Sequence, residues 1–401
     1  MEGFLTGYPI VRNLIVVTFF SYLFFQRDKF LAPQTKAHFW LCLVIMLSAL
    51  FNDGLGQSLA SIVQFLPAGL LPFIVVSGLL TTRKRQEVVM VVCIIAALCM
   101  VHNGYTQFNS PDDIGWSGTK TVEGKRITYM GIFGDPNDLG MFLVMSLPFA
   151  FYFGTFGGKL TKLCALFVIG ALLYGVYLTN SRGAMLGVMS LCGLYIYFRY
   201  GFTKTLSLGA IAAPVALFVM SKFRTIEQGE SANGRIAAWY EGFQMLKMNP
   251  IFGVGQGNFT EYNYHTAHNS FILVMAELGL SGYFAWSCIL GLSLFMLFKT
   301  VKHFDLYEHQ KSFSSDFIRE VAINKTLLFS MLGFMATGFF LSRSYTILFF
   351  VFCGMATACY YRAIKLEPEL CVSSFTPVVI TIGKYCLMSI IFLFTVTKLL
   401  L

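Results

Sequence analysis

Long apolar stretches separated by short polar turns recur from one end of the chain to the other. A stretch of about 17–25 apolar residues is long enough for a helix to cross a hydrocarbon core of about 30 Å. The pattern predicts about twelve transmembrane helices, near residues 10–26, 37–51, 58–80, 87–101, 138–156, 160–178, 183–198, 204–220, 269–298, 323–342, 345–361 and 379–399. We therefore predict an all-α, polytopic integral membrane protein whose residues 1–401 form a single transmembrane domain.

One polar interruption, residues 221–268, is much longer than the other turns and has internal order. Apolar residues recur in it at helical spacing, on one face that would carry Ile236, Trp239, Tyr240, Phe243 and Leu246. Ser231 or Asn233 can cap the start of such a helix. The spacing predicts an amphipathic helix that lies along the membrane surface or folds over a cavity.

The distribution of charge predicts which loops face the cytoplasm. Only 12% of the residues are charged, against about 25% in soluble proteins. Alternate loops collect 18 of the 29 lysines and arginines, and these loops should be cytoplasmic. The two longest polar loops, 102–137 and 221–268, have nearly balanced charge and should be extracytoplasmic. The net charge of +9 thus reflects membrane topology, and we expect membrane lipids and no nucleic acid as partners.

Three arginines fall at the predicted outer surface, where a lipid phosphate would lie. Arg182 and Arg343 occupy short turns between spans, and Arg235 lies in the long loop. Each could be an arginine that extends to the interface from a helix end or a solvated surface residue. A guanidinium group held at this depth could instead bind phosphate oxygens in bidentate fashion.

Histidine and carboxylate side chains follow at the entry to the span near 269–298. His268 and Asn269 precede an apolar run, and an unperturbed imidazole, with a pKa of about 6.5, can act as a base at neutral pH. His265 and His268 could share a zinc ion, but no third ligand has suitable spacing. Glu277 would lie inside the membrane, where a carboxylate is either functional or the partner of a buried arginine.

Six short motifs, taken in order, resemble the O-antigen ligase and O-antigen polymerase superfamily, bacterial multi-spanning glycosyltransferases of the GT-C type. The motifs are Phe133–Gly140, Asn180–Ala184, Gly234-Arg235, Gly253–Phe259, His268-Asn269 and Glu277–Gly279. The resemblance covers about residues 130–345. Taken alone, the Gly253–Phe259 segment predicts a flexible turn that lets the backbone approach another group closely. Asp135 and Asn137 stand where residues that cap an apolar helix commonly occur.

The resemblance implies glycan transfer in the bacterial inner membrane, with an active site on the extracytoplasmic face and without a metal or another cofactor. The donor would be an oligosaccharide on undecaprenyl diphosphate. The acceptor would be a lipid A-core sugar in a ligase of lipopolysaccharide, or a second lipid-linked repeat unit in a polymerase. Arg182 and Arg235 match the family's diphosphate-binding arginines, and His268 matches its essential histidine. The expected supporting residues are Arg343, Asn269, Glu277, Asp135 and Asn137.

Two alternatives stay open at this stage. The motifs do not separate a ligase from a polymerase, and the Phe133–Gly140 segment also resembles polymerases of exopolysaccharide and capsule. A transporter or flippase of lipid-linked oligosaccharide would also place arginines along an outward cavity. Transporters commonly contain internal repeats and charges near the membrane midplane. This chain shows no repeat, and its notable charges gather toward one membrane face, which favours a transferase.

Overall fold

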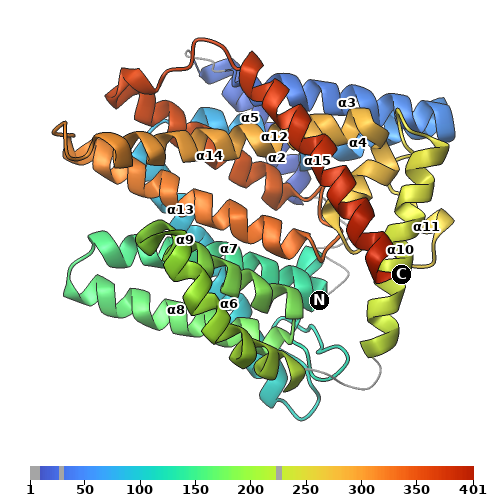
Figure 1. Cartoon of the computed structure of the whole chain (residues 1–401), viewed down its shortest axis with the longest axis horizontal. Coiled ribbons are helices and arrows are strands. Elements are labelled where there is room, and N and C mark those ends of the chain that lie inside the picture. Colours follow the sequence, from blue (N-terminus) through green and yellow to red (C-terminus); the bar gives the residue numbers. More distant parts are fainter. Residues whose placement is uncertain (1–9, 27–30, 223–227) are drawn as a thin grey trace. The chain divides into compact units, whose positions relative to one another are not determined.

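The computed structural model of the chain is built of helices (Figure 1). It describes residues 10–26, 31–222 and 228–401, with the backbone alone for 211–222 and 228–233. The helices are α2 (Ile10–Phe25), α3 (Pro33–Asn52), α4 (Leu55–Ala68), α5 (Leu70–Leu79), α6 (Arg83–Asn109), η1 (Gly131–Gly134), α7 (Pro136–Phe156), α8 (Lys159–Thr179), α9 (Arg182–Lys222), α10 (Gln228–Met248), α11 (Phe259–Tyr262), α12 (Ser270–Tyr307), α13 (Ser315–Gly338), α14 (Ile347–Leu366), η2 (Pro368–Leu370) and α15 (Thr376–Leu400). Within these ranges there is no strand, so the predicted all-α polytopic fold is confirmed.

Ten helical segments in the described ranges are long and apolar enough to cross a membrane, where the sequence predicts about twelve. Two segments account for the difference. Helix α2 has 16 residues and is shorter than the spanning helices. Helix α9 contains both predicted spans, 183–198 and 204–220, and the non-helical Gly201 (φ 81°, ψ 176°) separates them at the predicted turn. The span counted in α9 ends at Ala210, because residues 211–222 are described by their backbone alone.

Residue contacts divide the chain, predicted as one domain, into two compact units. Unit 1 comprises Glu87–Glu230 and Phe329–Leu341. Unit 2 comprises the described residues up to Gln86, Ser231–Leu328 and Ser342–Leu401. Helices α6, α10 and α13 each run from one unit into the other.

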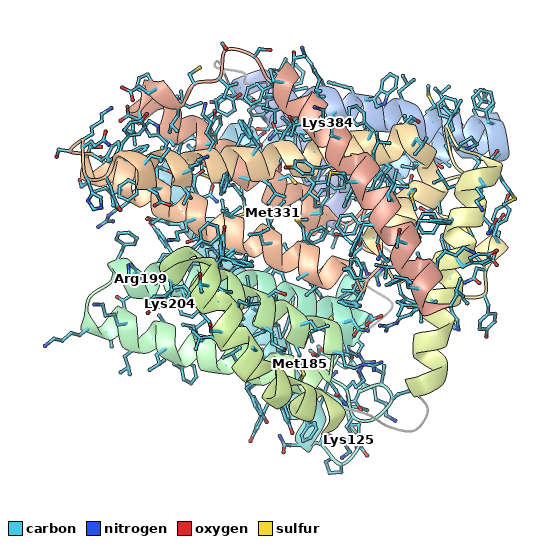
Figure 2. All side chains as sticks on the ribbon, in the orientation of Figure 1. Lys125, Met185, Arg199, Lys204, Met331 and Lys384 are labelled. Carbon is cyan, nitrogen blue, oxygen red and sulfur yellow. The ribbon has the colours of Figure 1, made fainter. Side chains whose placement is uncertain are left out.

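Helix α7 forms the core of unit 1 and packs against α8 and α9. Small residues permit this packing, since a Cβ added at Gly140 would lie 2.6 Å from the Ala184 Cβ. Lys125, in the segment between α6 and α7, lies at one end of this unit, and Arg199 and Lys204 of α9 lie at the other (Figure 2). The charge distribution predicts opposite membrane sides for these two groups.

The long segment between α6 and η1 is held to α6 by two buried amides. The Asn103 Oδ1 accepts from the Ser117 backbone N–H at 2.9 Å. The Gln107 Nε2 donates to the Thr119 carbonyl at 2.9 Å, and its Oε1 accepts from the Thr128 N–H at 3.0 Å. Buried polar groups need such partners, so these bonds fix the path of residues 117–128 toward the end of α8.

Helix α12 is the buried axis of unit 2 and packs against α3, α14 and α15. Its fully buried Trp286 stacks on Phe349 of α14 at a ring-centroid distance of 5.2 Å. The Trp286 indole N–H donates to the Ser344 carbonyl at 3.0 Å. This bond ties the turn before α14 to α12.

The predicted amphipathic helix is present as α10, but it begins earlier than its capping signals indicate. It starts at Gln228, so Ser231 and Asn233 lie within the helix and not at its start. Trp239 and Phe243 of the predicted apolar face are buried. Phe243 contacts Phe394 of α15 at a centroid distance of 5.4 Å. The helix therefore packs on unit 2 through part of the predicted face, since Ile236, Tyr240 and Leu246 are only half-buried, while Ala238 and Met245 outside that face are buried.

A buried ion pair joins three segments of unit 2 that the charge distribution places on the cytoplasmic side. Arg362 of α14 donates to Glu320 of α13 from Nε at 2.9 Å and from a terminal nitrogen at 3.0 Å. Its other terminal nitrogen donates to the Leu80 carbonyl at 2.7 Å. Both charged side chains are less than a tenth exposed.

Replacing Arg362 with leucine should destabilise the protein by about 3–5 kcal/mol, because the Glu320 carboxylate would stay buried without its partner. Thermal unfolding of the detergent-solubilised protein would measure the loss. Lys365→Leu, an exposed site on the same helix, is the matched control and should have little effect. Equal stability of the two variants would contradict a structural role for the pair.

Candidate functional site

An arginine cluster lies in unit 1 where α9 begins. Arg182 is the first residue of α9 and is half-buried. The Ser181 Oγ accepts from the Ala184 N–H at 3.2 Å and so caps the helix. A second arginine, Arg126, donates from Nε to the Thr179 carbonyl at 3.1 Å, at the end of α8. The N-terminus of α9, which attracts anions, thus carries Arg182 as its first residue and has the anchored Arg126 guanidinium nearby.

Asn137 joins the starts of α7 and α9. Its Oδ1 accepts from Arg126 at 3.0 Å and from the Ser181 hydroxyl at 2.7 Å. Asp135 caps α7, and its Oδ1 accepts from the Asn137 N–H at 2.7 Å and from the Asn137 side-chain amide at 2.9 Å. Asp135 and Asn137 therefore position Arg126 and Ser181, and the capping interpretation of Asp135 agrees with the geometry.

The pKa of Arg126 depends on its burial and on three neighbouring charges, one of them Arg182. Burial lowers the pKa of Arg126; Asp135 and Glu123 raise it, and the positive charge of Arg182 lowers it further. Arg126 was not among the predicted site residues, because in the sequence it is one of the charges that balance loop 102–137. Its position near the polar start of α7 was the signal in the sequence that could have identified Arg126. Only the folded path of residues 117–128 brings Arg126 near Arg182.

The histidine loop of unit 2, residues 264–269, leads into α12. The helix starts at Ser270, and the Asn269 side chain caps it by accepting from the N–H groups of Phe271 and Ile272 at 2.9 and 3.1 Å. His268 precedes this cap with φ of 47°, in the left-handed region that few non-glycine residues adopt. Such conformations concentrate at functional sites. The imidazole is half-buried and is positioned by the capped turn.

Arg235 lies on α10, close to the histidine loop. A Cβ added at the preceding residue, Gly234, would lie 3.9 Å from the His265 Cδ2. The His265 and His268 rings have centroids 6.3 Å apart. The helix turn that carries Arg235 therefore lies against the loop that carries both histidines.

Glu277 lies at a break in α12. Gly279 has φ of 63° and ψ of −165°, which interrupts the helix just after Glu277. The break leaves carbonyl groups without helical partners, and the Val254 and Gly255 N–H groups donate to the carbonyls of Ala276 and Glu277 at 3.1 and 3.0 Å.

Gly253 makes this close approach possible. A Cβ on Gly253 would collide with the Glu277 carbonyl carbon, so a side chain has no room there. The Gly253–Phe259 motif was predicted to be a turn whose backbone approaches another part of the molecule closely. In the structure that part is the interrupted backbone of α12 at Ala276 and Glu277.

A polar pocket of about 380 Å³ opens beside this break. Glu277, Arg343 and Tyr345 line it, together with residues of α4 and of segment 256–260. The Glu277 carboxylate interacts with the Tyr345 hydroxyl and with the N–H groups of Gly257 and Phe259. Arg343 is anchored through its backbone N–H, which donates to the Ser270 Oγ at 3.0 Å. Two of the predicted supporting residues therefore share one pocket.

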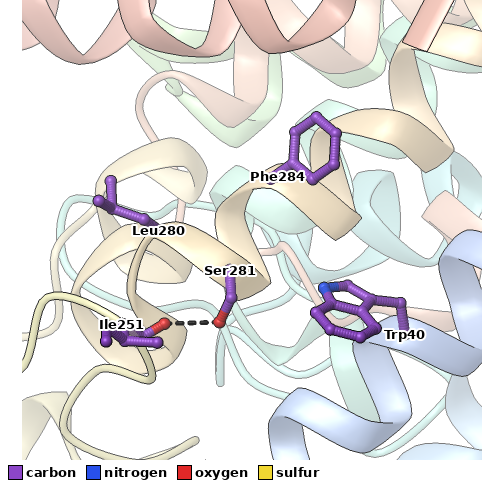
Figure 3. A pocket seen from close by; sticks show the side chains of 5 residues that line it. All are labelled: Trp40, Ile251, Leu280, Ser281 and Phe284. Atoms are coloured by element: carbon purple, nitrogen blue, oxygen red, sulfur yellow. Dashed lines mark hydrogen bonds between the residues drawn. The ribbon is translucent and has the colours of Figure 1, made fainter. Parts of the chain in front are cut away.

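A second hollow of unit 2, about 420 Å³, is apolar (Figure 3). Trp40, Leu280 and Phe284 line it, and Ser281 donates to the Ile251 carbonyl at its wall. Its lining contains no ionisable side chain. It therefore suits an acyl or isoprenoid chain and offers no group for acid–base chemistry.

The groups that could hold a metal lie elsewhere. In the part of the chain that the structure describes, one cluster of three ligand-type residues has suitable spacing, namely His303, Glu367 and Glu369. The Lys311 ammonium already contacts both carboxylates, at 2.6 and 3.4 Å. A lysine therefore supplies the cation that these carboxylates need.

The predicted site residues divide into two groups. Asp135, Asn137 and Arg182 belong to unit 1; Arg235, His268, Asn269, Glu277 and Arg343 belong to unit 2. Within unit 2, the Thr266 hydroxyl donates to the Ser342 hydroxyl at 2.9 Å and thereby links the histidine loop to the turn that carries Arg343.

Comparison with known proteins identifies the central segment. Residues 166–287 match the family described as O-antigen ligase. No curated protein matches the chain. The matched segment contains Arg182, Arg235, His268 and Glu277, and the superfamily predicted from the motifs is confirmed there.

Proposed function

We propose that this protein, whose residues 166–287 match the O-antigen ligase family, transfers a glycan from undecaprenyl diphosphate to an acceptor hydroxyl. The reaction takes place at the outer face of the bacterial inner membrane, needs no metal and inverts the anomeric configuration. The observation that carries the proposal is the arginine pair at the N-terminus of α9, where Arg182 is the first residue and the Arg126 guanidinium is anchored nearby.

The diphosphate is the part of the donor that the arginines recognise. It leaves with negative charge, and guanidinium groups can bind its oxygens in bidentate geometry. Arg182 and Arg235 stand at the two motif positions, and Arg126 adds a third guanidinium beside Arg182. Attraction to these groups increases as the bond to the leaving oxygen breaks, which lowers the barrier to transfer.

His268 is the proposed general base. Its ring takes the proton of the acceptor hydroxyl while that oxygen forms a bond to the anomeric carbon. The bond from this carbon to the diphosphate oxygen breaks on the opposite face, and the electron pair departs with undecaprenyl diphosphate. One displacement of this kind inverts the anomeric configuration. The capped turn at Asn269 and Ser270 supports a fixed position for the imidazole.

The outer location can be tested by labelling cysteines in a cysteine-depleted variant. A membrane-impermeant maleimide applied to intact cells should label Ser231→Cys but not Thr82→Cys, because loop 221–268 is predicted outside and loop 81–86 inside. Both should react after permeabilisation. The reverse pattern on intact cells would overturn the orientation and, with it, the outward placement of His268.

Transfer should survive EDTA, because the guanidinium groups meet the charge of the diphosphate and Asp135 caps α7. The measurement compares glycan transfer in chelator with transfer in added Mg²⁺, Mn²⁺ or Ca²⁺. Loss of activity in EDTA that one of these ions restores would contradict the metal-independent reaction. It would redirect attention to Asp135 and Asp138 as ligands.

An assay tests the proposed function directly: purified protein is incubated with a lipid-linked oligosaccharide and candidate acceptors. Release of undecaprenyl diphosphate with growth of a lipid-linked chain identifies a polymerase, and modification of lipid A-core identifies a ligase. If glycan is not transferred but lipid-linked oligosaccharide crosses proteoliposome membranes, the protein is a flippase and the proposal is wrong.

A further inference from the structure

The polar pocket beside Glu277 differs in chemistry from the arginine cluster. Its lining carries one basic side chain, Arg343, and one acidic side chain, Glu277. These charges offset each other, so the pocket has no excess of cations to bind a diphosphate. Its volume of about 380 Å³ lies within the range of small-molecule sites, about 300–1,000 Å³. The pocket therefore fits an uncharged, polar ligand.

The lining is rich in amides and hydroxyls. Gln57, Ser61 and Gln64 line it from α4, and Gln256, Thr266 and Ser342 line it from unit 2 segments that follow in the sequence. Amide and hydroxyl side chains both donate and accept hydrogen bonds. The hydroxyls of a sugar do the same, so each group on the ring can find a partner in this lining.

Glu277 and Tyr345 of the pocket lining interact with each other, and one carboxylate oxygen is left over. Glu277 is 3% exposed, and its Oε2 has no partner with hydrogen-bond geometry. A buried polar atom without a partner is destabilising. A ligand hydroxyl that donates to the carboxylate would satisfy this oxygen.

We propose that this pocket binds a neutral sugar ring of the glycan acceptor and that Gln57, Ser61 and Gln64 of α4 determine which sugar it accepts. The inference rests on the proposed glycan transfer for the identity of the ligand as an acceptor. Thr266, two residues before His268, lines the pocket, so a bound sugar lies beside the loop that carries the base. Helix α4 lies outside the matched segment 166–287 and so can vary with the acceptor while the chemistry stays the same.

Steady-state kinetics of the full chain test the assignment. Gln57→Ala and Gln64→Ala should each raise the KM for the acceptor about three- to tenfold, the loss expected for one or two neutral hydrogen bonds, and leave the KM for the lipid-linked donor unchanged. Ser61→Ala should act in the same direction. Ser58→Ala is the matched control on the same helix, because the Ser58 hydroxyl bonds to the Met46 carbonyl and does not line the pocket. An unchanged acceptor KM, or an increase in the donor KM instead, would overturn the assignment.

A binding experiment separates this inference from the proposed function. Methyl glycosides of glucose, galactose, mannose, rhamnose and N-acetylglucosamine are added to the detergent-solubilised chain, and saturation-transfer NMR detects binding. At least one should bind, and Gln64→Ala should weaken it while inorganic pyrophosphate does not compete. A protein that binds a glycoside in this way but transfers no glycan would retain the sugar site and overturn the transferase. If none of the glycosides binds the wild-type chain, the sugar site is wrong.

Discussion

Replacing His268 with alanine is expected to abolish measurable glycan transfer while leaving folding and donor binding largely intact. Removing a general base typically lowers a rate by about 10²- to 10⁴-fold. His268 adopts a left-handed conformation just before the capped start of α12, so the chain fixes where its ring can reach. The measurement is transfer from lipid-linked oligosaccharide, together with equilibrium binding of the donor.

His265 provides the matched control for this prediction. It lies in the same loop three residues earlier, but it is exposed and packs edge-on against the exposed Tyr264. His265→Ala should therefore retain most of the activity. An active His268→Ala protein, or one that loses donor binding and keeps the chemistry, would remove His268 from the role of base. Glu277 would then be the first alternative base to test.

The helices could be predicted well from the sequence, and so could the break at Gly201, but the break at Gly279 could not. Apolar runs determine where helices cross a membrane, because every backbone polar group in lipid must be bonded within the helix. The Gly201 interruption falls in the turn predicted between spans 183–198 and 204–220, whereas the Gly279 interruption lies inside one predicted span, 269–298, and leaves its hydropathy pattern almost unchanged. The Gly279 break depends on a distant partner, since segment 253–255 supplies the donors that the broken helix needs.

The same reasoning explains what could be predicted of the site. Arg182, Arg235 and His268 stand in short motifs whose order is visible in the sequence, and the matched segment contains all three. Arg126 and Gln57 belong to no such motif. Arg126 reaches the start of α9 because amides of α6 direct a long segment toward α8, and Gln57 lines the Glu277 pocket through tertiary packing alone. Short sequence motifs therefore indicate the residues proposed for diphosphate binding and proton transfer. The residues around them, such as Arg126 and Gln57, could be found only from the folded structure.

Arg182→Lys is expected to lower transfer nearly as much as Arg182→Ala, by ~10²-fold or more, and the same pair of substitutions at Arg235 should behave alike. The reason is geometric. A planar guanidinium binds two phosphate oxygens at once, and a lysine ammonium supplies charge without that fork. Binding of undecaprenyl diphosphate and the rate of glycan transfer would both be measured for each variant.

Substitutions of Arg126 and of its neighbour Lys125 test whether transfer depends on guanidinium geometry or on positive charge alone. Arg126→Lys should also reduce transfer, because its bonds to the Thr179 carbonyl and Asn137 need the guanidinium nitrogens and place its charge beside Arg182. Lys125→Ala removes one positive charge from the same loop, but this side chain is 58% exposed and lies near Asp113, so transfer should be unchanged. If the lysine variants at Arg182 and Arg235 turn over normally, the arginines contribute only general positive charge. Lys125→Ala would then be expected to weaken transfer as well, particularly at low ionic strength, where exposed charges are least screened.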